Sequence, residues 1–214
     1  MHSIPRLTRR DATRLSIVDK ADDLFHRFGF YKTTVADIAR ELEMSPANVY
    51  KFFSSKNALV QAVAERSLSL IKAGVTESVK NQKSPADQIK ALVLFIYRFH
   101  KSKLRHEREI YRLVLAAHDE QWPCVLQFKE FLHEVLGEIL CRGVKAKEFA
   151  PMDIAITAEV LMDGLTWIIN PLLMFTLKDV QVIKKIDNQT RFIERALSRK
   201  AFRQQRFSYP PISR

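Results

Sequence analysis

Apolar residues recur at intervals of three and four along most of this chain, and that repeat is typical of amphipathic helices rather than of strands. Between residues 11 and 28 they stand at Ile17, Ala21, Leu24, Phe25 and Phe28, and Gly29 then supplies a residue suited to ending a helix. The pattern also predicts helices over 35–42, 46–52, 56–80, 85–102, 107–119, 123–142 and 152–170, with a weaker one over 188–203. The expected fold class is all-α.

Capping residues and prolines mark where these helices begin and how they group. Ser45-Pro46 and Ser84-Pro85 each place a hydroxyl at the N-cap and proline at the first helical position, where its missing N–H costs nothing. Thr34 to Asp37 has the form of a capping box. We therefore predict a three-helix helix-turn-helix domain over 1–57, a larger antiparallel helical domain over 58–206 and a flexible tail over 207–214.

The apolar runs and the two cysteines of the sequence give expectations for the compartment and for disulfide bonding. It has no apolar run of about 18 residues, the length that crosses a membrane, and no apolar stretch follows the basic residues near its start. We therefore expect a cytoplasmic protein. Cys124 and Cys141 lie 17 residues apart on one predicted helix, a separation of roughly 25 Å, so they should not form a disulfide with each other. A redox role for either thiol stays open.

The charge balance suits a polyanionic partner, since the formal net charge is +11 and the isoelectric point is near 9.8. Residues 1–57, however, hold ten Lys and Arg against seven Asp and Glu, an excess of only three. A larger excess lies near the C-terminus, at Arg191, Arg195, Arg199, Lys200, Arg203 and Arg206. Net charge alone does not locate a nucleic-acid site, so a motif must.

Two short helices joined by a tight turn, over 34–42 and 46–52, form a helix-turn-helix. Ala39 is small enough for the two helices to cross, and Ile38, Leu42, Met44 and Val49 are apolar residues that hold the crossing. The residues left pointing outward from the second helix are Pro46, Ala47, Asn48 and Lys51. Such a helix enters the major groove, where Asn suits adenine and Lys suits guanine or a phosphate.

Residues 17–63 resemble the DNA-binding head of TetR-type (tetracycline-repressor-like) transcriptional regulators. The shared positions are Ala21, Leu24, Phe25, Gly29, Phe30, Thr34, Ile38, Ala39, Tyr50, Phe53 and Lys56. The resemblance implies double-stranded operator DNA as a partner, with phosphate contacts from Thr34, Tyr50 and Lys56 and base reading by Pro46, Ala47, Asn48 and Lys51. Arg9 and Arg10 would lie on an arm close to the DNA. Glu43 departs from the family, which usually has glycine in the turn.

Beyond the head, the helix over 152–170 predicts an association surface. Its apolar seam consists of Ile154, Ala158, Leu161, Leu165, Ile168 and Leu172, and a second face carries Ile156, Val160 and Trp167. We expect this helix and the last one to form a four-helix interface in a homodimer, as the resemblance also implies. Two heads related by a two-fold axis would then read a palindrome. The alternative is that the seam is only the core of one chain.

The effector site is expected among the helices of the larger domain. The candidate lining residues are Phe95, Phe99, Tyr111, His118, Trp122, Met162 and Trp167. Apolar walls with a few polar groups suit a small apolar or aromatic effector, and the resemblance implies that its binding releases a repressor from DNA. An activator stays possible.

Other function classes have less support. The six histidines show no metal-ligand spacing, and there is no glycine-rich phosphate loop or nucleophile motif, so we expect no catalysis, metal or cofactor. A helical ligand carrier that does not use DNA remains the second alternative.

Overall fold

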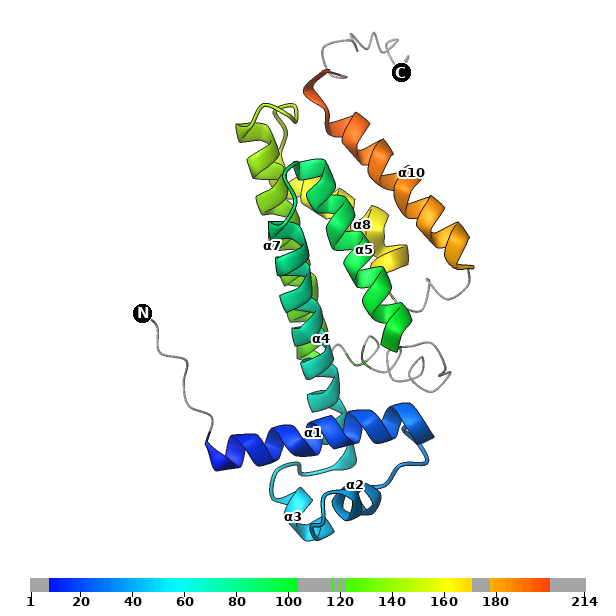
Figure 1. The fold of residues 1–214 in the computed structure, drawn as a ribbon. Helices are drawn as coiled ribbons and strands as arrows, with labels where there is room; N and C mark the ends of the chain where they lie inside the picture. The colour runs from blue at the N-terminus through cyan, green and yellow to red at the C-terminus, as the bar shows by residue number, and fades with distance from the viewer. Residues whose placement is uncertain (1–7, 104–116, 118–119, 121, 171–177, 201–214) are drawn as a thin grey trace, which may run out of the picture. The chain divides into compact units, whose positions relative to one another are not determined.

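The computed structural model describes residues 8–103, 117, 120, 122–170 and 178–200. Over these residues the chain is helical, with only an isolated antiparallel bridge between Phe149 and Ser198 (Figure 1). The helices are α1 (Arg9–Phe28), α2 (Val35–Glu41), α3 (Pro46–Tyr50), α4 (Lys56–Lys80), α5 (Pro85–Lys103), α7 (Pro123–Lys145), α8 (Ile154–Ile169) and α10 (Asp179–Leu197). The all-α prediction is confirmed. Among the described helices, none is both long and apolar enough to cross a membrane.

Two of the sequence predictions fall where the structure is not described. The helix expected over 107–119 lies outside the described residues except at Ala117, which is helical. The tail expected over 207–214 lies outside them altogether. Cys124 and Cys141 both lie on α7, as expected, and no disulfide joins them.

Local side-chain chemistry determines where α1 begins and ends. The Thr8 hydroxyl accepts the Asp11 amide N–H at 3.1 Å, and the Asp11 carboxylate accepts the Thr8 N–H at 3.2 Å. This reciprocal cap begins the helix at Arg9, two residues before the predicted start. At the other end Gly29 has φ 85°, and its N–H donates to the Phe25 carbonyl at 3.0 Å, so the predicted glycine stop is confirmed.

The last helix begins earlier than the sequence pattern predicted. The predicted start at 188 is wrong, because α10 begins at Asp179. Its buried face consists of Val182, Ile186, Thr190 and Ile193, and the first two precede the predicted start. The stretch before 188 holds Val180, Val182, Ile183 and Ile186 among its charged residues, so the helical spacing was present in the sequence and the prediction missed it. Packing against α5 accompanies the burial of Val182 and Ile186, while Val180 and Ile183 stay exposed.

The chain forms two compact units that differ from the predicted domains. The first consists of Met1–Leu70 with Leu104–Leu126, and the second of Ile71–Lys103 with Gln127–Arg214. Prediction placed a boundary near residue 57, whereas the first unit also includes the first part of α4 and a segment from much later in the chain. That segment belongs to it because Ala117 and Trp122 are buried in its core.

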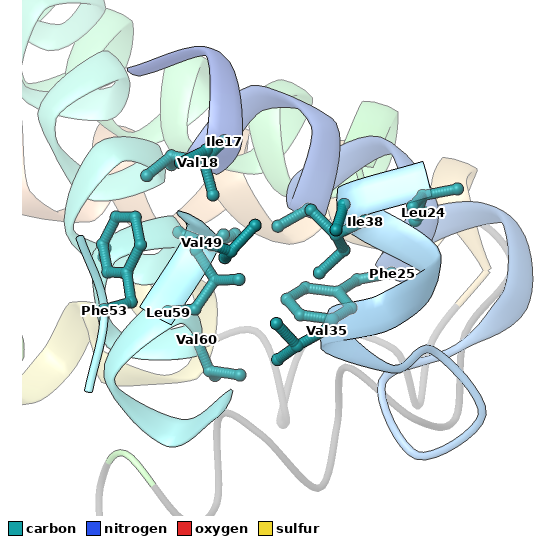
Figure 2. Close-up of a cluster of buried hydrophobic side chains, with 14 of the residues drawn as sticks. Ile17, Val18, Leu24, Phe25, Val35, Ile38, Val49, Phe53, Leu59 and Val60 are labelled. Carbon is teal, nitrogen blue, oxygen red and sulfur yellow. The ribbon is translucent and has the colours of Figure 1, made fainter. Parts of the chain in front are cut away.

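The core of the first unit is built by α1, α2, α3 and the start of α4, whose apolar side chains converge in Figure 2. Ile17, Ile38 and Leu59 have no exposed surface, and Val49 is 1% exposed. Ala39 is also fully buried, so the expected small residue at the helix crossing is confirmed. The apolar side chains Ile38 of α2 and Val49 of α3 are therefore covered, which holds these short helices in place.

The second unit packs α5 against α8 and α10 (Figure 1). Polar contacts join α5 to α10, because the Tyr97 hydroxyl donates to the Asp179 carboxylate at 2.9 Å and Lys90 pairs with Asp187 at 2.6 Å. On the α4 side, a Cβ atom at Gly74 would lie 1.9 Å from the Phe95 ring. Any larger residue at position 74 would therefore force the Phe95 ring to shift.

The seam predicted on α8 for a dimer is buried inside this unit. Ala158, Leu165 and Ile168 have no exposed surface and Leu161 is 8% exposed, while Ile154 is partly buried. A side chain already covered by its own chain cannot be the surface that a second chain covers. The alternative interpretation, a core of one protomer, therefore describes these residues. Leu172 lies outside the described residues.

Candidate nucleic-acid interface

The candidate interface begins at the start of α2, where Thr34 and Asp37 form a capping box. The Asp37 amide N–H donates to the Thr34 hydroxyl at 3.1 Å, and the Thr34 N–H donates to the Asp37 carboxylate at 2.9 Å. The Thr34 hydroxyl also donates to that carboxylate at 2.6 Å, and these bonds to Thr34 lower the pKa of Asp37. Thr34 is exposed, but the proton of its hydroxyl is donated to Asp37, so a phosphate accepts from this hydroxyl only by displacing that bond.

The turn between α2 and α3 is a Schellman motif built without glycine. Glu43 has φ 54°, and its N–H donates to the Arg40 carbonyl at 3.1 Å. The Met44 N–H donates to the Ala39 carbonyl at 2.9 Å. The family-like turn is thus retained, and the non-glycine residue in it adopts a left-handed conformation that costs about 1 kcal/mol.

Replacing Glu43 with glycine should therefore stabilise the first unit by about 0.5–1 kcal/mol, because glycine adopts this conformation without a steric cost. The measurement is the free energy of unfolding in urea. Glu43→Ala is the matched control, since it removes the carboxylate and keeps the Cβ atom. Equal stability of the two variants would show that the charge of Glu43, not its backbone conformation, causes the effect.

The short helix α3 presents one buried face and one open face. Ser45 caps it by accepting the Asn48 amide N–H at 3.3 Å, and Val49 anchors it in the core. Pro46, Ala47 and Lys51 are exposed, and Asn48 is partly exposed. Lys51 follows the helix directly with helical backbone angles, so it continues the same surface.

The candidate phosphate contacts differ in how available they are. The Tyr50 side chain, at the end of α3, is 50% exposed. Lys56 is partly buried: its Nζ donates to the Phe30 carbonyl at 2.5 Å and lies 4.2 Å from the centroid of the Phe30 ring. Burial lowers the pKa of Lys56. This lysine joins the start of α4 to the loop before α2, a structural contact that the sequence did not reveal.

Two arginines on α1, Arg10 and Arg14, extend the basic surface near α3, and the sequence analysis did not predict Arg14. The Arg10 guanidinium lies 6.0 Å from the centroid of the Phe52 ring, and that of Arg14 lies 4.9 Å from the centroid of Phe53. Both arginines are exposed. Their spacing of four residues on one helix was the available signal, because it places both on one face. Arg9 is also exposed.

The candidate effector residues fall in different places. Trp122 is buried in the first unit, 5% exposed, and its indole N–H donates to the Glu120 carboxylate at 2.9 Å. Phe95 and Phe99 are neighbours on α5, with ring centroids 6.3 Å apart. Trp167 donates to the Gln189 side chain at 2.5 Å. Tyr111 and His118 lie outside the described residues.

Met162 lines a hollow of about 390 Å³ between α7 and α8. The other lining residues are all ionisable: Lys129, Glu130, His133, Glu134, Glu159 and Asp163. Met162 is therefore the one residue of this hollow that was among the predicted effector contacts. Within the described part of the chain, no group of three or more His, Cys, Asp or Glu side chains could hold a metal ion.

An exposed apolar face remains on α8 and α10. Ile156 and Val160 are 60% and 61% exposed on α8, and Phe192 is 71% exposed on α10. The Gln189 amide of α10 donates to the Gly164 carbonyl of α8, so the two helices are in contact. Ile156 and Val160 belong to the second face noted in the sequence, opposite the buried seam.

Two family models match this chain. Residues 17–63 match the model described as "Bacterial regulatory proteins, tetR family". Residues 85–188 match the model described as "Tetracyclin repressor-like, C-terminal domain". A proposed mycofactocin biosynthesis transcriptional regulator of Mycobacterium tuberculosis H37Rv, MftR, is 26% identical over 151 residues, which are 70% of this chain and 75% of that protein.

Solved structures share the fold. A bacterial regulatory protein in the tetR family from Rhodococcus RHA1 has a TM-score of 0.58 at 20% identity, covering 86% of this chain and 96% of that one. A proposed transcriptional regulator from Saccharomonospora viridis in complex with choline has a TM-score of 0.61 at 18% identity, covering 87% and 98%. At these identities the likeness concerns the fold alone.

Proposed function

The chain belongs to the TetR family of bacterial regulatory proteins, and on that premise we propose that α3 reads a palindromic DNA operator in its major groove. Members of the family are transcriptional regulators, so this chain is a regulator and not an enzyme. One observation carries the proposal: Val49 is 1% exposed in the core while Pro46, Ala47 and Lys51 on the same short segment face solvent. A rigidly anchored and open helix is what groove reading requires.

Base reading is assigned to Pro46, Ala47, Asn48 and Lys51, and phosphate contact to Thr34 and Tyr50. The exposed arginines Arg10 and Arg14 add phosphate contacts at the edge of this surface. For Lys56 we propose a double role: its ammonium group donates one hydrogen bond to the Phe30 carbonyl, and its two other hydrogens can be donated to a phosphate. The direct experiment is a mobility shift with the promoter region of the chain's own gene. Absence of a shift with any fragment of that region, at low salt, counts against the proposal.

Replacing Asn48 with alanine should relax base preference at one position in each half-site, because a bidentate contact is worth about 1–3 kcal/mol of discrimination. Binding-site selection followed by sequencing measures this. Gln61→Ala is the matched control, since Gln61 is an exposed amide on α4 outside the α3 surface. An unaltered sequence preference in the Asn48 variant removes this residue from the readout.

We further propose a homodimer whose interface is the exposed face of α8 and α10, with Ile156, Val160 and Phe192 at its centre. Val160→Glu should then give monomers in sedimentation velocity, because two symmetry-related carboxylates would be buried without partners. Thr76→Glu, which adds the same charge to an exposed position on α4, should leave the dimer intact. A dimeric Val160 variant would exclude this face.

A small molecule bound in the second unit is proposed to release DNA, which makes the chain a repressor that acts where bacterial DNA lies, in the cytoplasm. The support is the match to the family's C-terminal domain and the solved relative that holds choline. By linkage, operator DNA must weaken effector binding by the same factor by which effector weakens DNA binding.

A further inference from the structure

His100, on α5, is a buried polar residue with an unsatisfied atom. The described residues contain three buried polar side chains, Thr33, His100 and Thr190. The Thr33 hydroxyl donates to the Gly29 carbonyl at 2.9 Å, and the Thr190 hydroxyl donates to the Ile186 carbonyl at 2.9 Å. In contrast, Nε2 of His100 has no hydrogen-bond partner in the structure, although the residue is only 7% exposed.

The other ring nitrogen determines which tautomer is present. The backbone of Ile169, at the end of α8, raises the pKa of His100, as a carbonyl oxygen beside the ring does. Because Nε2 has no partner and a carbonyl can only accept, we place the proton of the neutral ring on Nδ1, towards that carbonyl. Nε2 is then a bare lone pair, able to accept a hydrogen bond and unable to donate one. Burial lowers the pKa of His100 to about 4, so the ring stays neutral near pH 7.

The surroundings of the ring are apolar and aromatic. The centroid of Phe99 lies 6.3 Å from that of the imidazole, with its ring edge-on, and Phe95 lies a further 6.3 Å along α5. Phe99 itself is partly buried. A buried acceptor without a donor is costly, so Nε2 calls for a partner that the described residues do not supply.

We propose that Nε2 of His100 accepts a hydrogen bond from a small-molecule ligand with an apolar or aromatic body and one neutral donor, a hydroxyl or an amide N–H. The proposal rests on the proposed effector binding in the second unit and names the chemistry of that effector. Ligands that offer only acceptors, such as ketones, ethers and ionised carboxylates, would place a lone pair against a lone pair. They are excluded from this position.

The test uses matched pairs of probes that differ in one hydroxyl: 1-naphthol with naphthalene, 4-phenylphenol with biphenyl, and 1-decanol with decane. Dissociation constants for the full chain come from the shift of its unfolding midpoint with ligand concentration. At least one hydroxyl compound should bind the wild type about fivefold to tenfold more tightly than its hydrocarbon partner, the range of one hydrogen bond. In His100→Phe the preference should vanish while the hydrocarbon still binds.

A second measurement does not depend on a variant that folds. The Nε2 nitrogen resonance of His100 in the wild type should move upfield when a hydroxyl probe is added and stay in place with its hydrocarbon partner. Equal binding within every pair, a preference that survives in His100→Phe, or an unmoved resonance at saturation overturns the proposal.

Operator binding, measured in the same samples, separates this proposal from the proposed function. A hydroxyl preference that depends on His100 in a chain that binds no operator leaves the ligand site standing and removes the regulator function. Operator binding without any preference for the hydroxyl probes keeps the regulator function and removes the proposed ligand contact of His100.

Discussion

Replacing Trp122 with alanine is expected to lower the free energy of unfolding of the first unit by about 3–5 kcal/mol, the range for truncating a large buried aromatic residue. Trp122 follows the helix-turn-helix by some seventy residues, yet it is 5% exposed in the same core as Ile17, Ile38 and Val49. A loss of this size is a large share of the stability of an ordinary domain. Operator affinity should therefore fall sharply, although Trp122 lies on none of the DNA-facing segments.

The chain offers a matched control in its other tryptophan. Trp167 is only partly buried, on α8 of the second unit, where Lys185 lies 4.2 Å from its ring centroid. Trp167→Ala should leave operator affinity within about twofold of the wild type, because the first unit does not contain it. Hydrogen exchange of α2 and α3 reads the local stability directly. Unchanged protection of α2 and α3 from hydrogen exchange in Trp122→Ala contradicts the assignment of Trp122 to the core of the first unit.

Acidification is expected to remove about 3 kcal/mol of stability through His100 alone. Its pKa is about 4 in the folded chain and 6.5 in the unfolded one, so the unfolded state binds the proton more readily. The stabilisation by the neutral ring is complete above pH 6.5 and is lost progressively as pH falls towards 4. The 2.5-unit difference, at 1.36 kcal/mol for each unit, gives the expected loss.

The measurement is the free energy of unfolding in urea between pH 7 and pH 4, for the wild type and for His100→Phe. Asp37 and Asp187 also have lowered pKa values, through hydrogen bonds from Thr34 and Lys90 respectively, and their contributions only begin to be lost near pH 4 and are lost mainly below it. Both chains share them, so the difference between the two pH profiles isolates His100. His133→Phe, a partly exposed site on α7, is the control and should retain the slope of the wild type. Parallel profiles for wild type and His100→Phe exclude the expected effect.

Much of the helix-turn-helix was predictable because the interactions that start and end its helices join residues close together in the sequence. The capping box of Thr34 and Asp37, the Ser45-Pro46 start of α3 and the Gly29 stop each lie within four residues of the backbone groups that they satisfy. At Glu43 the sequence showed only a departure from the family's glycine, and the structure decided that the left-handed turn is kept with a non-glycine residue in it. Short-range hydrogen bonds and steric limits do not depend on what the rest of the chain does.

The sequence by itself determined that the chain is helical, the caps of α2 and α3 and the open face of α3. Only the tertiary structure decided that the α8 seam is buried while Ile156 and Val160 are exposed, and that Trp122 is part of the core of the first unit. It also decided that Lys56 donates to the Phe30 carbonyl and that Nε2 of His100 has no hydrogen-bond partner. The physical reason is that apolar periodicity shows which face of a helix must be covered, but not which element covers it. Nor does it show whether a buried polar atom finds a partner there, because partners come from distant parts of the chain.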